Sequence, residues 1–166
     1  MAKNKFKRDD IALFSEVNIK HFNLPGVGPI QGSLDYLTSK YIPAASNLAG
    51  RGQATIALPH FLCTEAKRAA TIEGDAAVAQ VIAQLLTLDH MNPYLFRLIC
   101  WLILSALKGR SGLLTDGTKF VFYYLKRDDE DGTRGYRLYQ SEELTTKTEK
   151  EAKMVLGALM VCVSNS

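Results

Sequence analysis

The chain has 166 residues, of which 47% are hydrophobic and 22% are charged, and its formal net charge is +3. This length and composition suffice for one folded domain with its own core, which excludes general disorder and a need for disulfide staples. The net charge is too small to indicate nucleic-acid binding by itself.

The basic residues are unevenly distributed along the chain. They outnumber the acidic residues over residues 1–70, and residues 1–10 are expected to form a basic flexible arm ahead of a single α+β domain over 11–166. We predict that the basic side chains of residues 1–70 bind an anionic partner, either a nucleic acid or an anionic membrane surface. They are Lys3, Lys5, Lys7, Arg8, Lys20, Lys40, Arg51, Lys67 and Arg68.

Three irregularly spaced cysteines, Cys63, Cys100 and Cys162, argue against a disulfide framework and for an intracellular compartment, cytoplasmic or nuclear. No apolar stretch follows the N-terminal cations, so no secretory signal is expected. The longest apolar stretch, from Tyr94 to Leu107, contains Arg97 and is shorter than the roughly 20 residues that cross a bilayer. It predicts a buried helix and no membrane span.

The N-terminal half mixes strand and loop signals. Alternating apolar and polar residues predict a strand within 11–22, and two prolines and three glycines predict a loop over 24–32. Ser33 is expected to cap a short helix that ends near Tyr41, because the apolar residues between them then form one stripe. Residues 54–58 predict a short strand.

Helical periodicity dominates the middle of the chain. Thr64 is expected to start a helical stretch that breaks at Gly74, and residues 75–86 continue with apolar side chains at helical spacing. Asn92 and Pro93 form a strong helix start, and this helix is expected to stop at Gly109.

The C-terminal third gives the clearest β signal. Residues 119–125 and 135–140 are rich in aromatic and β-branched side chains and predict a hairpin with a long charged loop. A final helix is expected to begin at a capping box of Thr146 and Glu149. Its inward side chains are expected to be Ala152, Val155, Leu156, Leu159 and Met160. The whole pattern predicts an α+β fold, in which a helical core of about four helices packs against a small antiparallel sheet that contains the aromatic hairpin.

The aromatic hairpin is a candidate surface for stacking of unpaired bases. Phe120, Phe122 and Tyr124 share one face of the predicted strand, and such a face can stack bases while nearby arginines contact phosphates. The alternative is that this face packs against the Tyr94–Leu107 helix, because a half-buried sheet needs an apolar face.

No complete metal or catalytic set is evident in the sequence. His60 and Cys63 have the spacing of half a zinc site, but a second close pair is missing. Cys63 with His60 or His90 is a conceivable nucleophile pair, and a helix start at Thr64 would lower the pKa of the thiol. The glycine-rich segments lack phosphate-loop spacing, and the acidic residues 128–131 lack the pattern of a calcium loop.

The sequence therefore predicts no metal, cofactor or small-molecule substrate, and favours a non-enzymatic protein that self-associates and engages an anionic partner. Small matrix or packaging proteins of viruses fit this description by size. Two alternatives stay open: a monomeric adaptor that binds another protein, and a cysteine-dependent enzyme centred on Cys63.

Overall fold

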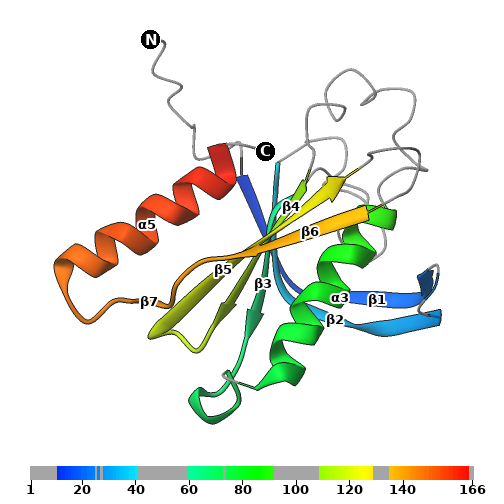
Figure 1. The fold of residues 1–166 in the computed structure, drawn as a ribbon, viewed down its shortest axis with the longest axis horizontal. Helices are drawn as coiled ribbons and strands as arrows, with labels where there is room; N and C mark the ends of the chain where they lie inside the picture. Colours follow the sequence, from blue (N-terminus) through cyan, green and yellow to red (C-terminus); the bar gives the residue numbers. More distant parts are fainter. Residues whose placement is uncertain are drawn as a thin grey trace.

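The computed structural model describes residues 11–24, 26, 28–40, 60–72, 74–91, 109–128 and 135–164. Within these ranges, seven strands form one mostly antiparallel sheet, and two α-helices pack on it (Figure 1). The strands are β1 (Ile11–Leu24), β2 (Gly28–Lys40), β3 (His60–Ala66), β4 (Gly109–Thr115), β5 (Lys119–Asp128), β6 (Gly135–Gln140) and β7 (Leu144–Thr145). The helices are α3 (Asp75–Met91), α5 (Glu149–Ser164) and the short 3₁₀ turn η2 (Ala69–Thr71).

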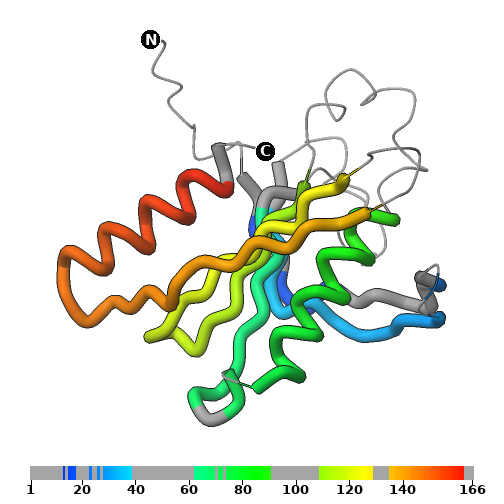
Figure 2. The backbone as a smooth tube through the Cα atoms, viewed as in Figure 1, coloured from blue at the N-terminus to red at the C-terminus, as the bar shows by residue number. Residues whose placement is uncertain are grey.

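The two helices cover opposite faces of the sheet. Successive strand residues point to opposite faces, and on β4 Leu113 packs in the cluster of α5 while Leu114 packs in the cluster of α3. The same alternation separates Phe122 from Tyr123 on β5. The domain is therefore built of three layers, α3, sheet and α5, with an apolar core on each side (Figure 2).

The strands follow one another across the sheet in the order β1-β2-β3-β4-β5-β6, and β7 pairs with β5. All neighbouring strands are antiparallel except β3 and β4, which are parallel and have α3 between them in the chain. Parallel neighbours need a crossover connection of this kind.

The pairing between β1 and β2 covers more residues than the pairing between β2 and β3. β1 pairs with β2 from Ile11–Lys40 to Leu24–Gly28, whereas β2 pairs with β3 only over Tyr36–Ser39. The remainder of the hairpin is a two-stranded ribbon that extends beyond β3.

The prediction of a core of about four helices is wrong. The described residues contain two α-helices and a seven-stranded sheet that is the larger part of the fold. The expected short strand over 54–58 and the expected helix over 93–108 lie outside the described residues. None of the helices in the described ranges combines the length and apolar character that a membrane crossing requires.

Two segments expected to be helical are strands. The segment from Ser33 toward Tyr41 lies in β2 up to Lys40, because it pairs along its length with β1. Thr64, expected to start a helix, lies within β3 between β2 and β4. Gly109, expected to end a helix, begins β4.

Other predicted elements are confirmed. The strand within 11–22 is part of β1, the helix over 75–86 is part of α3, and the hairpin strands are β5 and β6. The final helix is also confirmed as α5.

The start and the inward face of α5 differ from the prediction. The capping box is formed by Thr148 and Glu151, whose side chains each bond the other's backbone N–H, at 3.2 and 3.0 Å. The side chains that pack on the sheet are Val155, Ala158, Leu159 and Cys162. Leu156 and Met160, both expected inside, are 57% exposed.

The packing of β4 against β5 leaves no room for a side chain at Gly109. A Cβ atom there would lie 2.4 Å from Cζ of Tyr124 and 2.7 Å from the backbone oxygen of Leu125. By contrast, a Cβ on Gly157, on the outer side of α5, would meet nothing within 4 Å.

We therefore expect Gly109→Ala to lower the free energy of unfolding by about 1–3 kcal/mol, because the backbone of β5 must move. The matched change Gly157→Ala should raise it by up to about 1 kcal/mol through helix propensity. Urea unfolding followed by circular dichroism measures both. Equal stability of the two variants would contradict this packing of β4 on β5.

Candidate active site

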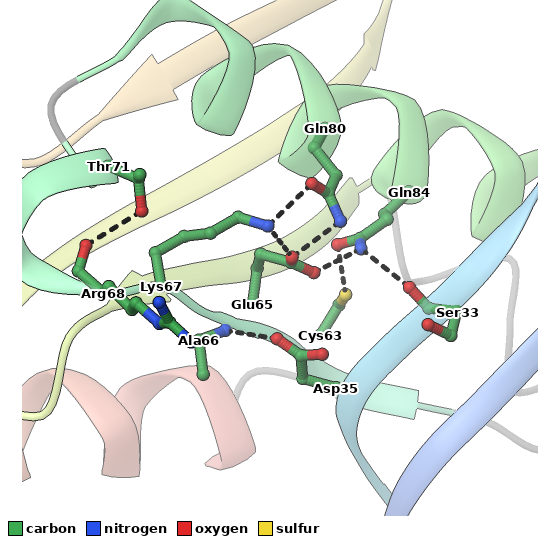
Figure 3. Close-up of polar contacts among 10 residues, drawn as sticks. All are labelled: Ser33, Asp35, Cys63, Glu65, Ala66, Lys67, Arg68, Thr71, Gln80 and Gln84. Carbon is green, nitrogen blue, oxygen red and sulfur yellow. Dashed lines mark hydrogen bonds and ion pairs between the residues drawn. The ribbon is translucent and has the colours of Figure 1, made fainter.

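A buried carboxylate lies under the N-terminal half of α3. The Glu65 residue is only 2% exposed, although it is charged and lies near the end of β3. Its Oε1 accepts hydrogen bonds from Lys67 Nζ (2.5 Å) and Gln80 Nε2 (2.6 Å), and its Oε2 accepts one from Gln84 Nε2 (2.6 Å; Figure 3). Desolvation of a carboxylate is costly unless such donors replace water.

The local sequence explains why these groups meet. Glu65 is on β3 and Lys67 follows the strand directly, and side chains two residues apart in extended chain lie on the same face. Gln80 and Gln84 are four residues apart on α3 and therefore share one face of that helix. The Lys67 side chain is 24% exposed, so the cluster reaches from the buried Glu65 to the protein surface.

A second carboxylate lies beside this cluster on β2. Asp35 Oδ2 accepts a hydrogen bond of 2.7 Å from the backbone N–H of Ala66, the residue between Glu65 and Lys67. Besides burial, the charges of Glu65 and Asp35 raise the pKa of the Cys63 thiol. Asp35 also sits where the β1–β2 ribbon leaves the sheet, one residue before the pairing with β3 begins.

The backbone of β1 is irregular at the same place. Glu16 has a φ of 52°, in the left-handed region that non-glycine residues rarely adopt. It lies between the pairs Ser15–Tyr36 and Val17–Leu34 and therefore opposite Asp35. Backbone outliers of this kind concentrate at functional sites.

The composition of the cluster suits one class of chemistry. Magnesium is usually held by one or two carboxylates, with water and substrate phosphate oxygens completing its shell. Asp35 and Glu65 supply two carboxylates, and Lys67 supplies an ammonium group that pairs with Glu65. Across the described ranges no three His, Cys, Asp or Glu residues gather as a metal site, so a cation here would depend on water and substrate oxygens.

The structure places two of the predicted anion-binding residues at this site. Lys67 is paired with Glu65, and the next residue, Arg68, is exposed. Lys20 is in β1 and Lys40 is in β2, and the side chains of both are outside the described part of the structure. The remaining predicted residues fall outside the described residues: Lys3, Lys5, Lys7, Arg8 and Arg51.

The three aromatic residues predicted to stack bases do not form an open platform. Phe122 is buried and Phe120 is half-buried, and both pack in the cluster with α5. Tyr124 is 41% exposed, and its ring lies 6.3 Å from that of Tyr139 on β6. A helix does pack on this face, and it is α5. The Tyr94–Leu107 segment, which the prediction named, lies outside the described residues.

Cys63 does not have the environment predicted for a reactive thiol. It lies inside β3 and not before a helix, and it is 1% exposed. Burial raises the pKa of the Cys63 thiol well above its usual value, and the charges of Glu65 and Asp35 raise it further. His90 is in the last turn of α3, where Nδ1 lies 2.9 Å from the Leu86 oxygen, and the side chain of His60 is outside the description.

Sequence reasoning missed a second polar cluster, at the other end of α3. Asp89 is 7% exposed and accepts hydrogen bonds from Arg127 Nη2 (2.6 Å) and the Tyr136 hydroxyl (3.0 Å). Arg110 Nε lies 3.6 Å from the same carboxylate. This cluster ties α3 to β4, β5 and β6.

Comparisons of the chain with protein-family models, with curated proteins and with solved structures found no match. The arrangement of the described residues therefore carries the functional argument.

The burial of Cys63 gives a direct prediction for thiol chemistry. At pH 8 in the folded protein, iodoacetamide should label Cys162, which is half-buried, well before Cys63. Peptide mass spectrometry at a series of times measures both rates, and the same reaction in urea shows that both thiols are competent. Labelling of Cys63 as fast as Cys162 in the folded protein would contradict this burial.

Proposed function

We propose that this chain is a divalent-cation-dependent phosphodiesterase that acts on nucleic acid, with Asp35, Glu65 and Lys67 as its active-site residues. The observation that carries the proposal is the buried Glu65 carboxylate, which pairs with Lys67 at 2.5 Å and lies beside Asp35 of the neighbouring strand. Titratable side chains that gather where a buried cluster reaches the surface mark a candidate functional site.

Each residue has a role that follows from its chemistry. A bound divalent cation would supply an activated water and neutralise charge on a phosphate oxygen. Asp35 and Glu65 would be the oxygen ligands of that cation. Lys67, whose side chain is 24% exposed and whose ammonium is bonded to Glu65 and Gln80, would bind the phosphate and stabilise the negative charge that develops when water attacks phosphorus.

Two features support a polymer as the substrate. Arg68 is exposed directly after Lys67, so a second cation is available for a neighbouring phosphate. The strand that carries Asp35 continues as the two-stranded β1–β2 ribbon, and a two-stranded ribbon fits the major groove of a duplex. The anionic partner expected from the sequence would thus be the substrate.

Cleavage assays with DNA and RNA oligonucleotides in Mg²⁺ or Mn²⁺ test the proposal. We expect Glu65→Gln, Asp35→Asn and Lys67→Met each to lower the rate by at least about 100-fold, because each removes charge from the site. EDTA should abolish cleavage. Arg68→Ala should weaken substrate binding and reduce its dependence on salt.

Glu143→Gln is the matched control, because Glu143 is also a carboxylate paired with a lysine, Lys119, but at the surface. It should cleave like the unmodified protein. The proposal fails if the unmodified protein cleaves neither polymer with either cation, or if Glu65→Gln and Asp35→Asn cleave as well as Glu143→Gln.

A second candidate function is the self-association expected from the sequence. α5 exposes four large apolar side chains between 50% and 57%, in two pairs on either side of the face that packs on the sheet, and exposed apolar surface of this kind suits contact with another chain. They are Met154, Leu156, Met160 and Val161. In an assembly role this surface would make the contact, and the carboxylates of Asp35 and Glu65 would have no function.

Sedimentation velocity at several protein concentrations measures this association. If α5 mediates it, Met160→Glu should shift the protein toward the monomer, because a charge would enter the contact. Leu138→Glu is the control, since Leu138 is also exposed but lies on β6. A protein that is monomeric at all concentrations would exclude this role and leave the expected monomeric adaptor open.

A further inference from the structure

We propose that the β5–β6 hairpin carries a binding surface for single-stranded nucleic acid. Tyr124 and Tyr139 stack unpaired bases there, and Lys126 and Arg137 contact the phosphates. We call these four residues the hairpin platform. The platform is on the face of the sheet on which α5 packs, opposite the face that carries Glu65 and α3. The inference therefore goes beyond the proposed function and needs no bound cation.

The pleat of the two strands places the four side chains on one face. Phe122, Tyr124 and Lys126 are alternate residues of β5, and Phe122 packs in the cluster with α5. In the pairing of β5 with β6, Tyr139 is directly opposite Tyr124, and Arg137 is directly opposite Lys126. Directly opposite residues point to the same side of a sheet. Two tyrosines and two cations thus form adjacent pairs on the same surface.

The two tyrosines of the platform are open to solvent. Tyr124 is 41% exposed and Tyr139 is 47% exposed, and their ring centroids lie 6.3 Å apart at an angle of 39°. Phe120 and Phe122, on the same strand as Tyr124, pack with α5 instead. Exposed rings on a sheet are stacking surfaces for any base, because every base has a π face.

The ring of Tyr124 is held in place by the strand next to it. A Cβ atom at Gly109 would lie 2.4 Å from Cζ and 2.5 Å from the hydroxyl oxygen of Tyr124, so the ring rests against the bare backbone of β4. A side chain that is already ordered loses little conformational freedom when a ligand binds. This half of the platform is therefore preorganised for a base.

The charges of the platform favour an anion. Lys126 and Arg137 are directly opposite, and like charges in that arrangement destabilise a strand pair. Asp128 compensates one of them through a 2.6 Å ion pair with Arg137, whose side chain is still 56% exposed. Two cations against one carboxylate leave one positive charge in excess, which a phosphate would neutralise.

The spacing of the two pairs suits a nucleotide. Residues two apart on a strand are separated by about 7 Å, so the cations lie within reach of the phosphate of a base stacked on the rings. A single strand fits this surface better than a duplex does, because paired bases stack on one another and leave no free face for a tyrosine. Aromatic rings beside cations are the usual equipment of surfaces that bind single strands.

The experiment measures binding by fluorescence anisotropy in EDTA, so that cleavage does not contribute. The probes are labelled oligothymidine and oligouridine of about 12 nucleotides, an abasic DNA backbone of the same length and a DNA duplex. Comparison of the first two probes shows which sugar the platform prefers. Tyr139→Leu removes a ring at the edge of the sheet, and Tyr139→Phe keeps it. Tyr36→Leu is the matched control, since Tyr36 is 43% exposed but lies on β2.

We expect Tyr139→Leu to bind the single strands about 10-fold more weakly, as loss of one stacked base implies. Its affinity for the abasic backbone and for the duplex should not change, because neither offers a base to the ring. Tyr139→Phe and Tyr36→Leu should bind like the unmodified protein. Lys126→Gln should weaken binding of the oligonucleotides and of the abasic backbone and lower the salt dependence by about one phosphate contact.

Three results would overturn the inference. The first is that neither single strand binds at low salt. The second is that Tyr139→Leu binds the single strands as well as Tyr36→Leu does. The third is that Tyr139→Leu loses as much affinity for the abasic backbone as for oligothymidine, since the ring then makes no contact with a base. Circular dichroism melting of each variant shows that it is folded in the assay.

The platform and the proposed active site can fail separately. Glu65→Gln should bind the single strands like the unmodified protein, because its change is on the opposite face of the sheet. Binding that needs Tyr139, without cleavage in Mg²⁺ or Mn²⁺, would refute the proposed function and support the platform. Cleavage by a protein whose binding does not depend on Tyr139 would refute the platform and leave the active site in place.

Discussion

The burial of the Glu65 carboxylate is the constraint on which the α3 side of the domain depends. A carboxylate that is 2% exposed must find donors within the protein, and three side chains supply them. Two of the three, Gln80 and Gln84, lie on successive turns of α3, so satisfying Glu65 also fixes how far the helix can slide along the sheet. The hydrogen bonds to Glu65 and the packing of α3 on the sheet therefore depend on each other. A substitution that changes one must alter the other.

The two helices are held to the sheet in different ways. α3 is fixed at both ends by buried charges, with Glu65 near its start and Asp89 in its last turn. α5 packs on the opposite face through apolar contacts around Val155 and Leu159. Polar pairs are directional and specify one arrangement, whereas apolar packing is non-directional. The face with α3 is thus the better place for a site that needs groups held within fractions of an ångström, as catalysis and cation binding do.

The parts of the fold that could be predicted are those where periodicity and packing agree. The aromatic and β-branched run of β5 packs in the cores on both faces of the sheet, the helical repeat of α3 packs on one of them, and both elements were predictable. The segment after Ser33 was not, because Leu34 and Leu37 fit helical spacing although both are fully buried in a strand that pairs with β1. Gly109 was misleading for a related reason: glycine ends helices, but here it allows the Tyr124 ring to approach the backbone of β4.

The candidate site could not be seen in the sequence because the segment that starts at Thr64 was predicted to be a helix. If Thr64 begins a helix, Glu65 and Lys67 point in different directions and resemble an ordinary solvated turn, because residues two apart do not face each other on a helix. In an extended strand the same two residues share a face, and the glutamate is carried under α3 with the lysine beside it. Asp35 was hidden in the same way by the helix expected in its segment, although it lies on the neighbouring strand. The chemistry of these three residues could not be recognised from their spacing alone, since it arises from pairing between strands that only the fold brings together.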